Sequence, residues 1–310
     1  MQGKNLLSIA DLDPSGVRNL INKAVELKKG PRLPVLSGKV LALIFEKPSL
    51  RTRVSFDVAM HQLGGHTIYL SPAEVGLGKR EPVRDVAGVL SRYVDGIVAR
   101  TFSQDVQVEL ARWSSIPIIN GLSDEEHPCQ ALGDFLTIFE KKGSLKGINL
   151  AYIGDGNNVA NSLLLTAALA GVNFHIASPE GYNVPSGLRS KAENLAETSG
   201  ARLEFGEDPV KAVADADIIY TDVWVSMGQE EEKEKRLAAF KKYQVNEKLL
   251  SASRKNPFVM HPMPVHHGEE LESSLVYGPR SILLDQAENR LHIQKAVLFY
   301  FMGAAGSEAL

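Results

Sequence analysis

Residues 40–53, VLALIFEKPSLRTR, join an apolar run to a short turn that carries two arginines and two hydroxyl groups. The run Val40–Phe45 has the length and composition of a buried strand, and apolar residues recur at helical spacing from Val54 to Leu63. The turn Ser49–Arg53 therefore lies at the end of a strand and the start of a helix, where unpaired N–H groups and the helix dipole attract anions. A hydroxyl here is often only a helix cap, but the two guanidinium groups beside it favour a phosphate-binding site.

The composition is that of a soluble globular protein, with 44% hydrophobic and 23% charged residues in a chain of 310. This length favours two domains. Lys and Arg number 34 against 37 for Asp and Glu, so the net charge of −3 argues against binding to nucleic acid or a membrane through overall charge. Cys129 is the one cysteine, which excludes an intrachain disulfide. The sequence shows neither a signal core nor a membrane-spanning run, and we expect a cytoplasmic protein.

Strand-like and helix-like segments alternate along the chain, which predicts an α/β fold with parallel sheets. We expect strands near residues 40–45, 67–69, 96–99, 116–119, 148–153, 174–178, 218–221, 258–260 and 282–284. We expect helices near residues 12–28, 52–63, 83–93, 106–113, 128–141, 159–170, 187–198 and 286–302. The polar turn Lys141–Ser144 predicts a boundary between a first domain, 1–143, and a second, 144–310. No strand follows the last helix, so it can pack back on the first domain.

Polar residues cluster where the predicted strands end, and parallel sheets bind their ligands beyond these ends. In the first domain the strand ends carry Arg51, Arg100 and His127, which suit a polyanion. In the second domain they carry Asp155 and Asp222, which suit a cation. We therefore expect one cleft between the two domains, which binds a phosphate-bearing donor and an amine-bearing acceptor.

At these positions the chain resembles the aspartate and ornithine carbamoyltransferase superfamily, and within it the ornithine enzymes, over nearly its whole length. The matching segments are residues 45–53 (FEKPSLRTR), 127–130 (HPCQ), 157–158 (NN), 222–228 (DVWVSMG) and 287–290 (AENR). Several motifs in the family's order are far more specific than any single one. The resemblance implies two doubly wound domains with a cleft between them, no cofactor and no metal. It also implies a homotrimer, or a multiple of trimers, in which a neighbouring subunit completes each active site.

The resemblance implies transfer of the carbamoyl group of carbamoyl phosphate to the side-chain amine of L-ornithine, which gives L-citrulline and phosphate in arginine metabolism. By resemblance, the residues that bind carbamoyl phosphate are Ser49, Leu50, Arg51, Thr52, Arg100, His127, Gln130, Pro262, Met263 and Arg290, of which Arg51, Thr52, Arg100 and His127 are catalytic. The residues that bind ornithine are Asn158, Asp222, Ser226 and Met227. These roles agree with the chemistry, because attack by the amine builds negative charge on a carbonyl oxygen that nearby donors stabilise.

Three positions depart from the family pattern. Pro262 stands where ornithine enzymes usually have a cysteine, and Gly76 stands where many relatives have a glutamine. Leu50 replaces the usual threonine, a mild change for a residue that acts through its backbone. Proline removes the thiol and the backbone N–H, but the carbonyl groups of Pro262 and Met263 remain to accept from the carbamoyl NH2 group. Two alternatives therefore stay open: a carbamoyltransferase for putrescine or aspartate, and a non-catalytic paralogue that binds carbamoyl phosphate.

Two further patterns suggest other chemistry. Gly154 and Gly156 follow a strand, as in nicotinamide-dependent oxidoreductases, but position 159 is valine where that fingerprint has its third glycine. His261, His266 and His267 lie close together, but no cysteine or second carboxylate pattern frames them. We interpret these histidines as part of a loop and expect no metal there.

Overall fold

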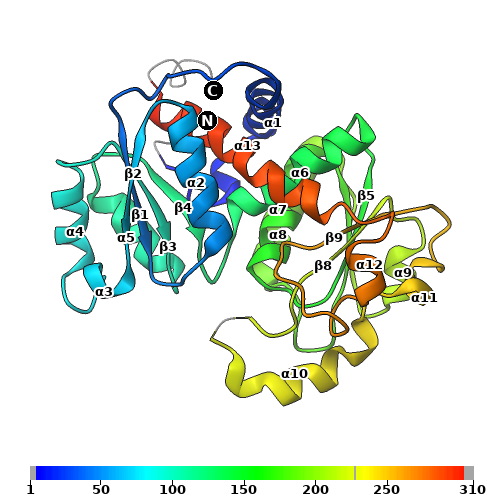
Figure 1. Cartoon of the computed structure of the whole chain (residues 1–310). Helices are drawn as coiled ribbons and strands as arrows, with labels where there is room; N and C mark the ends of the chain where they lie inside the picture. Colours follow the sequence, from blue (N-terminus) through cyan, green and yellow to red (C-terminus); the bar gives the residue numbers. More distant parts are fainter. Residues whose placement is uncertain (1–4, 227, 304–310) are drawn as a thin grey trace. The chain divides into compact units, whose positions relative to one another are not determined.

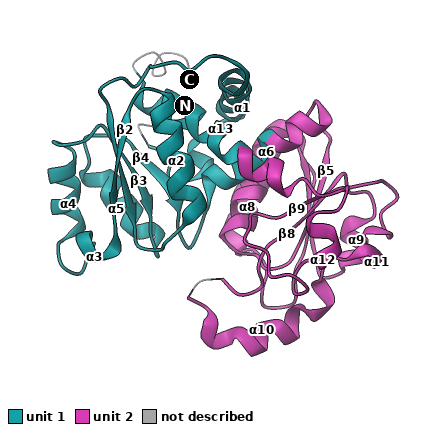
Figure 2. Cartoon of the chain, in the orientation of Figure 1, with its two compact units in different colours: residues 1–136, 289–310 teal, residues 137–288 magenta. Residues whose placement is uncertain are grey.

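The computed structural model describes residues 5–226 and 228–303 (Figure 1). The chain divides into two compact units (Figure 2). Unit 1 consists of residues 1–136 and 289–310, and unit 2 of residues 137–288.

Two helices contain the points where the chain passes between the units. The first division falls inside α6 (Pro128–Lys142), whereas the boundary predicted between residues 143 and 144 follows the end of this helix. The second falls inside α13 (Leu283–Met302), which begins in unit 2 and belongs to unit 1 from Asn289 onward. Most of the last helix is therefore part of unit 1.

Unit 1 is built on a four-stranded parallel sheet of order β2-β1-β3-β4. The strands are β1 (Val40–Phe45), β2 (His66–Leu70), β3 (Gly96–Arg100) and β4 (Ile118–Leu122). The helices are η1 (Ile9–Asp11), α1 (Pro14–Lys29), α2 (Leu50–Gln62), α3 (Pro72–Val75), α4 (Val83–Leu90) and α5 (Gln104–Trp113), with parts of α6 and α13. The central strands β1 and β3 are apolar on both faces because helices cover both.

Alternate residues of β3 show how the two faces of this sheet are filled. Ile97 and Ala99 join a hydrophobic cluster with Val86 of α4 and Leu110 of α5. Gly96 points to the opposite face, where a Cβ atom would lie only 2.9 Å from the sulfur of Met302 in α13. Glycine at position 96 therefore allows the last helix to pack closely against the sheet.

Unit 2 is built on a five-stranded parallel sheet of order β7-β6-β5-β8-β9. The strands are β5 (Asn149–Ile153), β6 (Asn173–Ala177), β7 (Leu203–Gly206), β8 (Ile218–Thr221) and β9 (Phe258–Met260). Besides the parts of α6 and α13, the helices are α7 (Asn158–Ala170), α8 (Ser186–Ser199), α9 (Pro209–Val213), η2 (Glu230–Glu232), α10 (Lys233–Phe240), η3 (Lys241–Tyr243), α11 (Glu247–Leu250) and α12 (Ser273–Val276). One face packs against α9 to α12 in a cluster that includes Ile153, Ile219 and Val259. Helix α7 is buried from Val159 to Leu169.

The predicted elements agree with the structure within a few residues, with one wrong assignment. The apolar run predicted as a strand at residues 282–284 is not a strand, because α13 already begins at Leu283 and only Ser281 forms an isolated bridge with Val259. Strand β7 was not predicted, since this half-exposed edge strand has the weak pattern Leu-Glu-Phe-Gly. Apolar residues at the start of a buried helix and in a short strand look alike in sequence.

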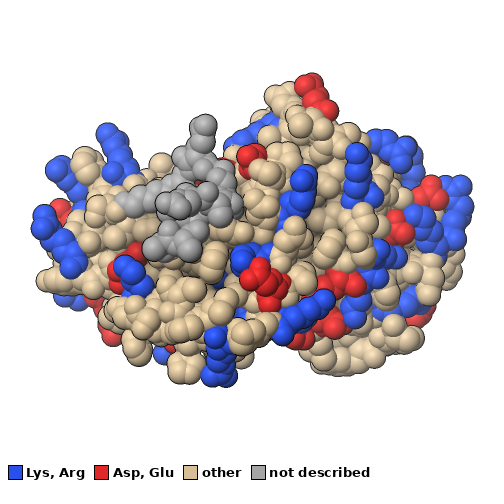
Figure 3. Space-filling model, turned by 90° about the horizontal axis from the view of Figure 1, so that it is seen from above, with Lys and Arg blue, Asp and Glu red and all other residues tan. Residues whose placement is uncertain are grey.

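Two properties of the whole chain bear on its possible partners. Of the helices within residues 5–226 and 228–303, none combines the length and apolar character that crossing a bilayer requires. On the face shown in Figure 3, basic and acidic side chains are both spread across the surface. This face therefore matches the near balance of charges in the sequence.

Candidate active site

The order of the strands in unit 1 marks where a ligand is expected. The chain leaves β1 to form β2 on one side and then β3 on the other, so the order reverses between β1 and β3. Beyond the carboxyl ends of two such strands, doubly wound sheets have a crevice that binds ligands. The register pairs Phe45 with Arg100, which places the turn Ser49–Arg53 and the end of β3 at the same edge.

The turn Ser49–Arg53 forms the first turn of α2, as the sequence predicts. Ser49 is the N-cap residue, and its hydroxyl accepts a hydrogen bond from the N–H of Thr52 at 3.3 Å. The Leu50 side chain is 75% exposed, so this residue has only its backbone to offer to a ligand at the turn. The N–H groups of the turn and the dipole of α2 together attract an anion.

Arg290 of α13 is held against this turn by two side chains of unit 1. Its Nη2 donates to the hydroxyl of Thr52 at 3.1 Å, and its Nη1 donates to the side-chain carbonyl of Gln130. Gln130 in turn donates to Asp134 at 2.7 Å. All four side chains are buried, so the guanidinium of Arg290 has a fixed position. The close approach of α13 to α6 is possible because Gly133 faces Arg290.

Three arginines, Arg51, Arg100 and Arg290, concentrate positive charge at this edge. Burial, together with the charges of Arg290 and Arg51, lowers the pKa of Arg100 to about 10, so it remains protonated at neutral pH. Burial also lowers the pKa of Arg51. Within the described residues, the buried Nε of Arg100 has no hydrogen-bond partner. A buried guanidinium nitrogen of Arg100 that lacks a partner is unfavourable, which points to an anionic ligand near this residue.

His127 remains neutral in this environment. It is buried immediately before α6, and burial with the charges of Arg290 and Arg100 holds its pKa well below the usual 6.5. A neutral imidazole donates a hydrogen bond from one nitrogen and accepts one at the other. The residue therefore suits a polar, uncharged group of the ligand, such as a carbonyl oxygen.

Unit 2 has its own reversal of strand order. From β5 the chain forms β6 and β7 on one side and then β8 and β9 on the other, so the order reverses between β5 and β8. The register pairs Ile153 with Thr221, which places the loop 154–157 and the segment 222–226 at one edge. This segment contains Asp222 and Ser226, which are expected to bind ornithine.

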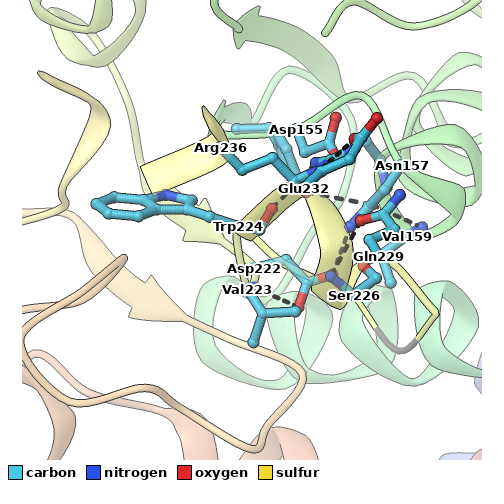
Figure 4. A network of polar contacts seen from close by, with 12 residues as sticks. Asp155, Asn157, Val159, Asp222, Val223, Trp224, Ser226, Gln229, Glu232 and Arg236 are labelled. Atoms are coloured by element: carbon cyan, nitrogen blue, oxygen red, sulfur yellow. Dashed lines mark hydrogen bonds and ion pairs between the residues drawn. The ribbon is translucent and has the colours of Figure 1, made fainter. Parts of the chain in front are cut away.

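Asp222 is a buried acidic residue at the carboxyl ends of the strands of unit 2 (Figure 4). Its carboxylate accepts from the Asn157 side chain at 2.8 Å and from the N–H of Val223 at 2.8 Å. Asn157 also caps α7, because its side-chain oxygen accepts from the N–H groups of Val159 and Ala160. Burial raises the pKa of Asp222, although His261 and the two donors oppose this. A buried carboxylate whose charge is incompletely compensated suits a cationic ligand.

A buried ion pair fixes the loop that follows Asp222 (Figure 4). Nη1 of Arg236 lies 2.7 Å from Asp155 Oδ2 and 3.0 Å from the carbonyl oxygen of Trp224, to which it also donates. Arg236 is 6% exposed and Asp155 is 7% exposed. At the other end of the loop, the N–H of Ser226 donates to the Gln229 side chain at 3.1 Å. The pair thus ties α10 to the loop after β5.

The loop after β9 is organised by a buried histidine. His261 Nε2 lies 3.0 Å from Glu270 Oε1, and His261 Nδ1 accepts from the N–H of Met263 at 2.9 Å. The N–H of His261 donates to Gln286 at 2.9 Å. Met263 has a φ of 56°, in the left-handed region. These bonds give Pro262 and Met263 a defined backbone, whose carbonyl groups were predicted to contact the carbamoyl group.

The predicted site residues fall into two groups. In unit 1, Thr52, Gln130 and Arg290 form one hydrogen-bonded set, and Arg51, Arg100 and His127 belong to the same electrostatic cluster. In unit 2, Asn158 is the first residue of α7, next to the residue that binds Asp222, and Ser226 follows Asp222 in its loop. Met227 lies outside the described residues. The ligand-binding roles of both groups, and the cleft between the domains, remain predictions.

Sequence reasoning missed the parts played by Asn157 and Arg236. Asn157 lay within a matched motif, and its position directly before the first turn of α7 is a capping signal. Arg236 follows the charged run Gln229–Lys235, whose composition is typical of a solvated helix or loop. Its spacing four residues after Glu232 and four before the buried Phe240 marks the inner face of a helix.

Comparison with known proteins links both units to one family. Residues 4–140 match the family model described as "Aspartate/ornithine carbamoyltransferase, carbamoyl-P binding domain". Residues 146–301 match the model described as "Aspartate/ornithine carbamoyltransferase, Asp/Orn binding domain". The chain is 49% identical over 302 residues to an ornithine carbamoyltransferase of Anoxybacillus flavithermus, with 96% of each chain covered. It is 50% identical over 304 residues to one of Archaeoglobus fulgidus, with 97% of this chain and 98% of the relative covered.

Solved structures agree with these sequence comparisons. The ornithine carbamoyltransferase of Pyrococcus furiosus superposes with a TM-score of 0.93 at 47% identity, with 97% of each chain covered. That of Gloeobacter violaceus superposes with a TM-score of 0.89 at 47% identity, with 97% of this chain and 99% of that chain covered.

Proposed function

Because this chain belongs to the aspartate/ornithine carbamoyltransferase family, we propose that it transfers the carbamoyl group of carbamoyl phosphate to the side-chain amine of L-ornithine. The products are L-citrulline and inorganic phosphate. The observation that carries this proposal is the opposite charge of the two strand-end sites. Arginines gather at the reversal point of unit 1, and a buried carboxylate lies at that of unit 2.

The donor occupies the site of unit 1. The phosphate of carbamoyl phosphate binds at the first turn of α2, where Ser49, Thr52 and the backbone N–H groups surround it and Arg51 neutralises its charge. Arg100 contacts both the phosphate and the carbonyl oxygen. Arg290, fixed by Thr52 and Gln130, contacts the carbamoyl group.

The acceptor occupies the site of unit 2. The carboxylate of Asp222 and the loop through Ser226 hold the amino-acid end of ornithine, and Asn157 orients that carboxylate. Aspartate, with two carboxylates, has the wrong charge for this site. Putrescine lacks the α-carboxylate, so it has no group for the N–H donors of the loop.

Transfer requires a neutral amine. The lone pair of ornithine Nδ attacks the carbamoyl carbon, the bond between that carbon and the bridging phosphate oxygen breaks, and the amine loses a proton. Alkyl amines of this kind titrate near ~10.4, so a positively charged surrounding favours the neutral form. No side chain is assigned as the general base, and catalysis rests on positioning and electrostatics.

The residues that accelerate the step are those that stabilise the negative charge developing on two oxygen-bearing groups. Negative charge grows on the carbonyl oxygen as the amine attacks, where Arg100, neutral His127 and the Thr52 hydroxyl donate. Negative charge also grows on the departing phosphate, which Arg51 and the end of α2 stabilise. Removing a single donor of this kind typically costs about 100- to 1,000-fold in kcat.

Product analysis with three acceptors tests the proposal. Purified protein is mixed with carbamoyl phosphate and either ornithine, aspartate or putrescine, and each ureido product is measured. We expect citrulline, and only traces with the other two acceptors. A ureido product from putrescine or aspartate alone would reassign the acceptor. Carbamoyl phosphate binding without any product would identify a non-catalytic paralogue. The proline at position 262, where ornithine enzymes usually have a cysteine, would then be the first residue to test as the cause.

The family also supports finer proposals about assembly and context. We infer that the chain forms a homotrimer, in which a neighbouring subunit completes each active site, and that it acts in arginine metabolism in the cytoplasm. Light scattering during gel filtration tests the assembly. The expected mass is that of three 33.8 kDa chains or a multiple of this, and a monomer with full activity would contradict it.

A further inference from the structure

Unit 1 contains a second cationic cavity, distinct from the candidate active site. It has a volume of about 250 Å³ and lies where the carboxyl-terminal ends of α1 and α2 meet the middle of α13. The residues that matter for the argument are Leu27, Lys28, Arg32, His292 and Lys295. Arg51, Arg100 and Arg290 do not line it.

The lining of this cavity has excess positive charge. Arg32 and Lys295 contribute two charges, Lys28 adds a third cationic side chain, and none of the described residues that line the cavity carries a carboxylate. The ends of α1 and α2 present carbonyl groups, each equivalent to roughly half a negative charge. The two helix ends therefore offset about one of the charges of Arg32 and Lys295.

Lys295 is the most informative residue of the cavity. It is 5% exposed, and its ammonium group donates to the carbonyl oxygen of Leu27 at 2.8 Å. An ammonium has three protons to donate. Burial, and then the nearby charge of Arg32, lower the pKa of Lys295. A buried ammonium that faces a guanidinium instead of a carboxylate is costly unless an anion lies between them.

We propose that this cavity binds a small, multiply charged oxyanion of the phosphate type, with Lys295 at its inner wall and Arg32 at its mouth. Arg32 is exposed, and a guanidinium pairs with two oxygens of such a group at once. Sites for drug-sized molecules usually have about 300–1,000 Å³. The smaller cavity suits phosphate, diphosphate or a phosphomonoester of a few carbons.

Helix α13 connects this cavity to the donor site. It carries Lys295 at the cavity and Arg290, five residues earlier, at the donor site. Lys28 of the cavity donates to the side-chain oxygen of Asn289 at 2.9 Å, next to Arg290. The proposed anion thus acts on the same helix that positions a donor-site arginine.

Calorimetric titration with inorganic diphosphate tests the proposal. The donor site also attracts phosphate, so the titration is made in an Arg51→Gln background, with and without Arg32→Gln. We expect the added Arg32→Gln to weaken one saturable binding event by about tenfold or more, as expected for loss of a charge-assisted hydrogen bond. Arg32 is on the surface, so its replacement leaves folding intact, which the thermal midpoint checks.

Lys29→Gln is the matched control. Lys29 is exposed, lies three residues from Arg32 and does not line the cavity. We expect diphosphate affinity to stay unchanged in this variant. Equal effects of the two substitutions would mean diffuse surface attraction and would overturn the proposal. Absence of an Arg32-dependent binding event would also overturn the proposal. Lys295 would then serve only to cap the carboxyl-terminal end of α1 through the carbonyl group of Leu27. The citrulline assay fails or succeeds independently of this result.

Discussion

Single residues at the donor site differ in their expected importance although they carry the same charge. Arg51 and Arg53 are two residues apart in the first turn of α2. Arg51 is half-buried and close enough to lower the pKa of Arg100, whereas Arg53 is exposed and its guanidinium lies 3.8 Å from the centre of the Tyr69 ring. The sequence motif alone treats the two arginines alike, and only their burial separates them.

This difference predicts unequal effects on turnover. Arg51→Gln is expected to lower kcat by about 100-fold or more, because the departing phosphate loses its main counter-charge. Arg53→Gln is expected to change kcat by less than about threefold, in line with the small worth of exposed charges. Steady-state kinetics with carbamoyl phosphate and ornithine measure both. Comparable losses in the two variants would place the phosphate elsewhere on α2.

Asp222 is expected to act on the acceptor alone. Asp222→Asn keeps the shape of the side chain and removes its charge, so KM for ornithine should rise about 10- to 100-fold, the equivalent of a charge-assisted hydrogen bond. KM for carbamoyl phosphate should stay unchanged. Because burial raises the pKa of Asp222, the wild-type KM for ornithine should also rise as the pH falls, and the variant should lack this dependence. An unchanged ornithine KM would reassign the acceptor site.

Cys129 is expected to be chemically inert. Burial raises the pKa of its thiol to about 12, and its sulfur lies 3.8 Å from the carbonyl oxygen of Asn120. The reactive thiolate is therefore scarce at neutral pH. Native protein should keep its activity in excess iodoacetamide, whereas protein in denaturant should take up one label. Rapid inactivation of the native protein would show that the thiol is accessible.

At the scale of helices and strands, the turns at the strand ends were easier to predict than the contacts between distant segments. Residues 49–53 carry a local signal for the proposed phosphate site, because the cap, the hydroxyl groups and the guanidinium groups lie within one helical turn. The pairing of Arg236 with Asp155 joins residues 81 positions apart and has no local signature. Sequence periodicity reports burial of one face of a helix but not the partner that covers it.

The Arg236–Asp155 pair predicts a specific loss when it is broken. Arg236→Gln leaves the buried Asp155 without its counter-charge, which typically costs about 3–5 kcal/mol of stability. The loop after Asp222 also loses its tie through the carbonyl of Trp224, so KM for ornithine should rise while KM for carbamoyl phosphate does not. Denaturation and steady-state kinetics measure the two effects.

Two further variants distinguish loss of the ion pair from a general effect of substitutions in α10. Lys235→Gln removes a neighbouring charge of α10 on an exposed residue and should leave both stability and KM unchanged. The double variant Asp155→Asn with Arg236→Gln should be more stable than Arg236→Gln alone, because it leaves no uncompensated buried charge. The explanation would be contradicted if the double variant lost as much stability, relative to the wild type, as Asp155→Asn and Arg236→Gln lose together when measured separately.

At the scale of the whole molecule, buried His127 and half-buried His175 link stability to pH. The pKa of His127 lies well below 6.5, through burial and then Arg290 and Arg100, and burial also lowers the pKa of His175. As the pH falls below about 6.5, these two histidines bind protons in the unfolded chain but stay unprotonated in the folded chain. The stability that these groups contribute is thus complete above about pH 6.5 and is lost on acidification, by at most about 1.4 kcal/mol per pH unit for each histidine.

Equilibrium denaturation between about pH 5 and 7, above the range where most carboxylates titrate, checks this expectation. His127→Asn should make stability less dependent on pH, even if the variant is less stable at pH 7. An identical slope in wild type and His127→Asn would mean that other groups cause the acid sensitivity.

The passage of α13 from unit 2 into unit 1 affects the order in which the protein is made. Unit 2 is one continuous segment, whereas unit 1 needs residues 289–303, which a ribosome adds only after all of unit 2. Until then a nascent chain has neither Arg290 beside Thr52 nor Met302 against Gly96. Unit 1 can therefore complete its fold only after residues 289–303 have been synthesised. A chain released before that point would expose an apolar face of the unit 1 sheet to chaperones and proteases.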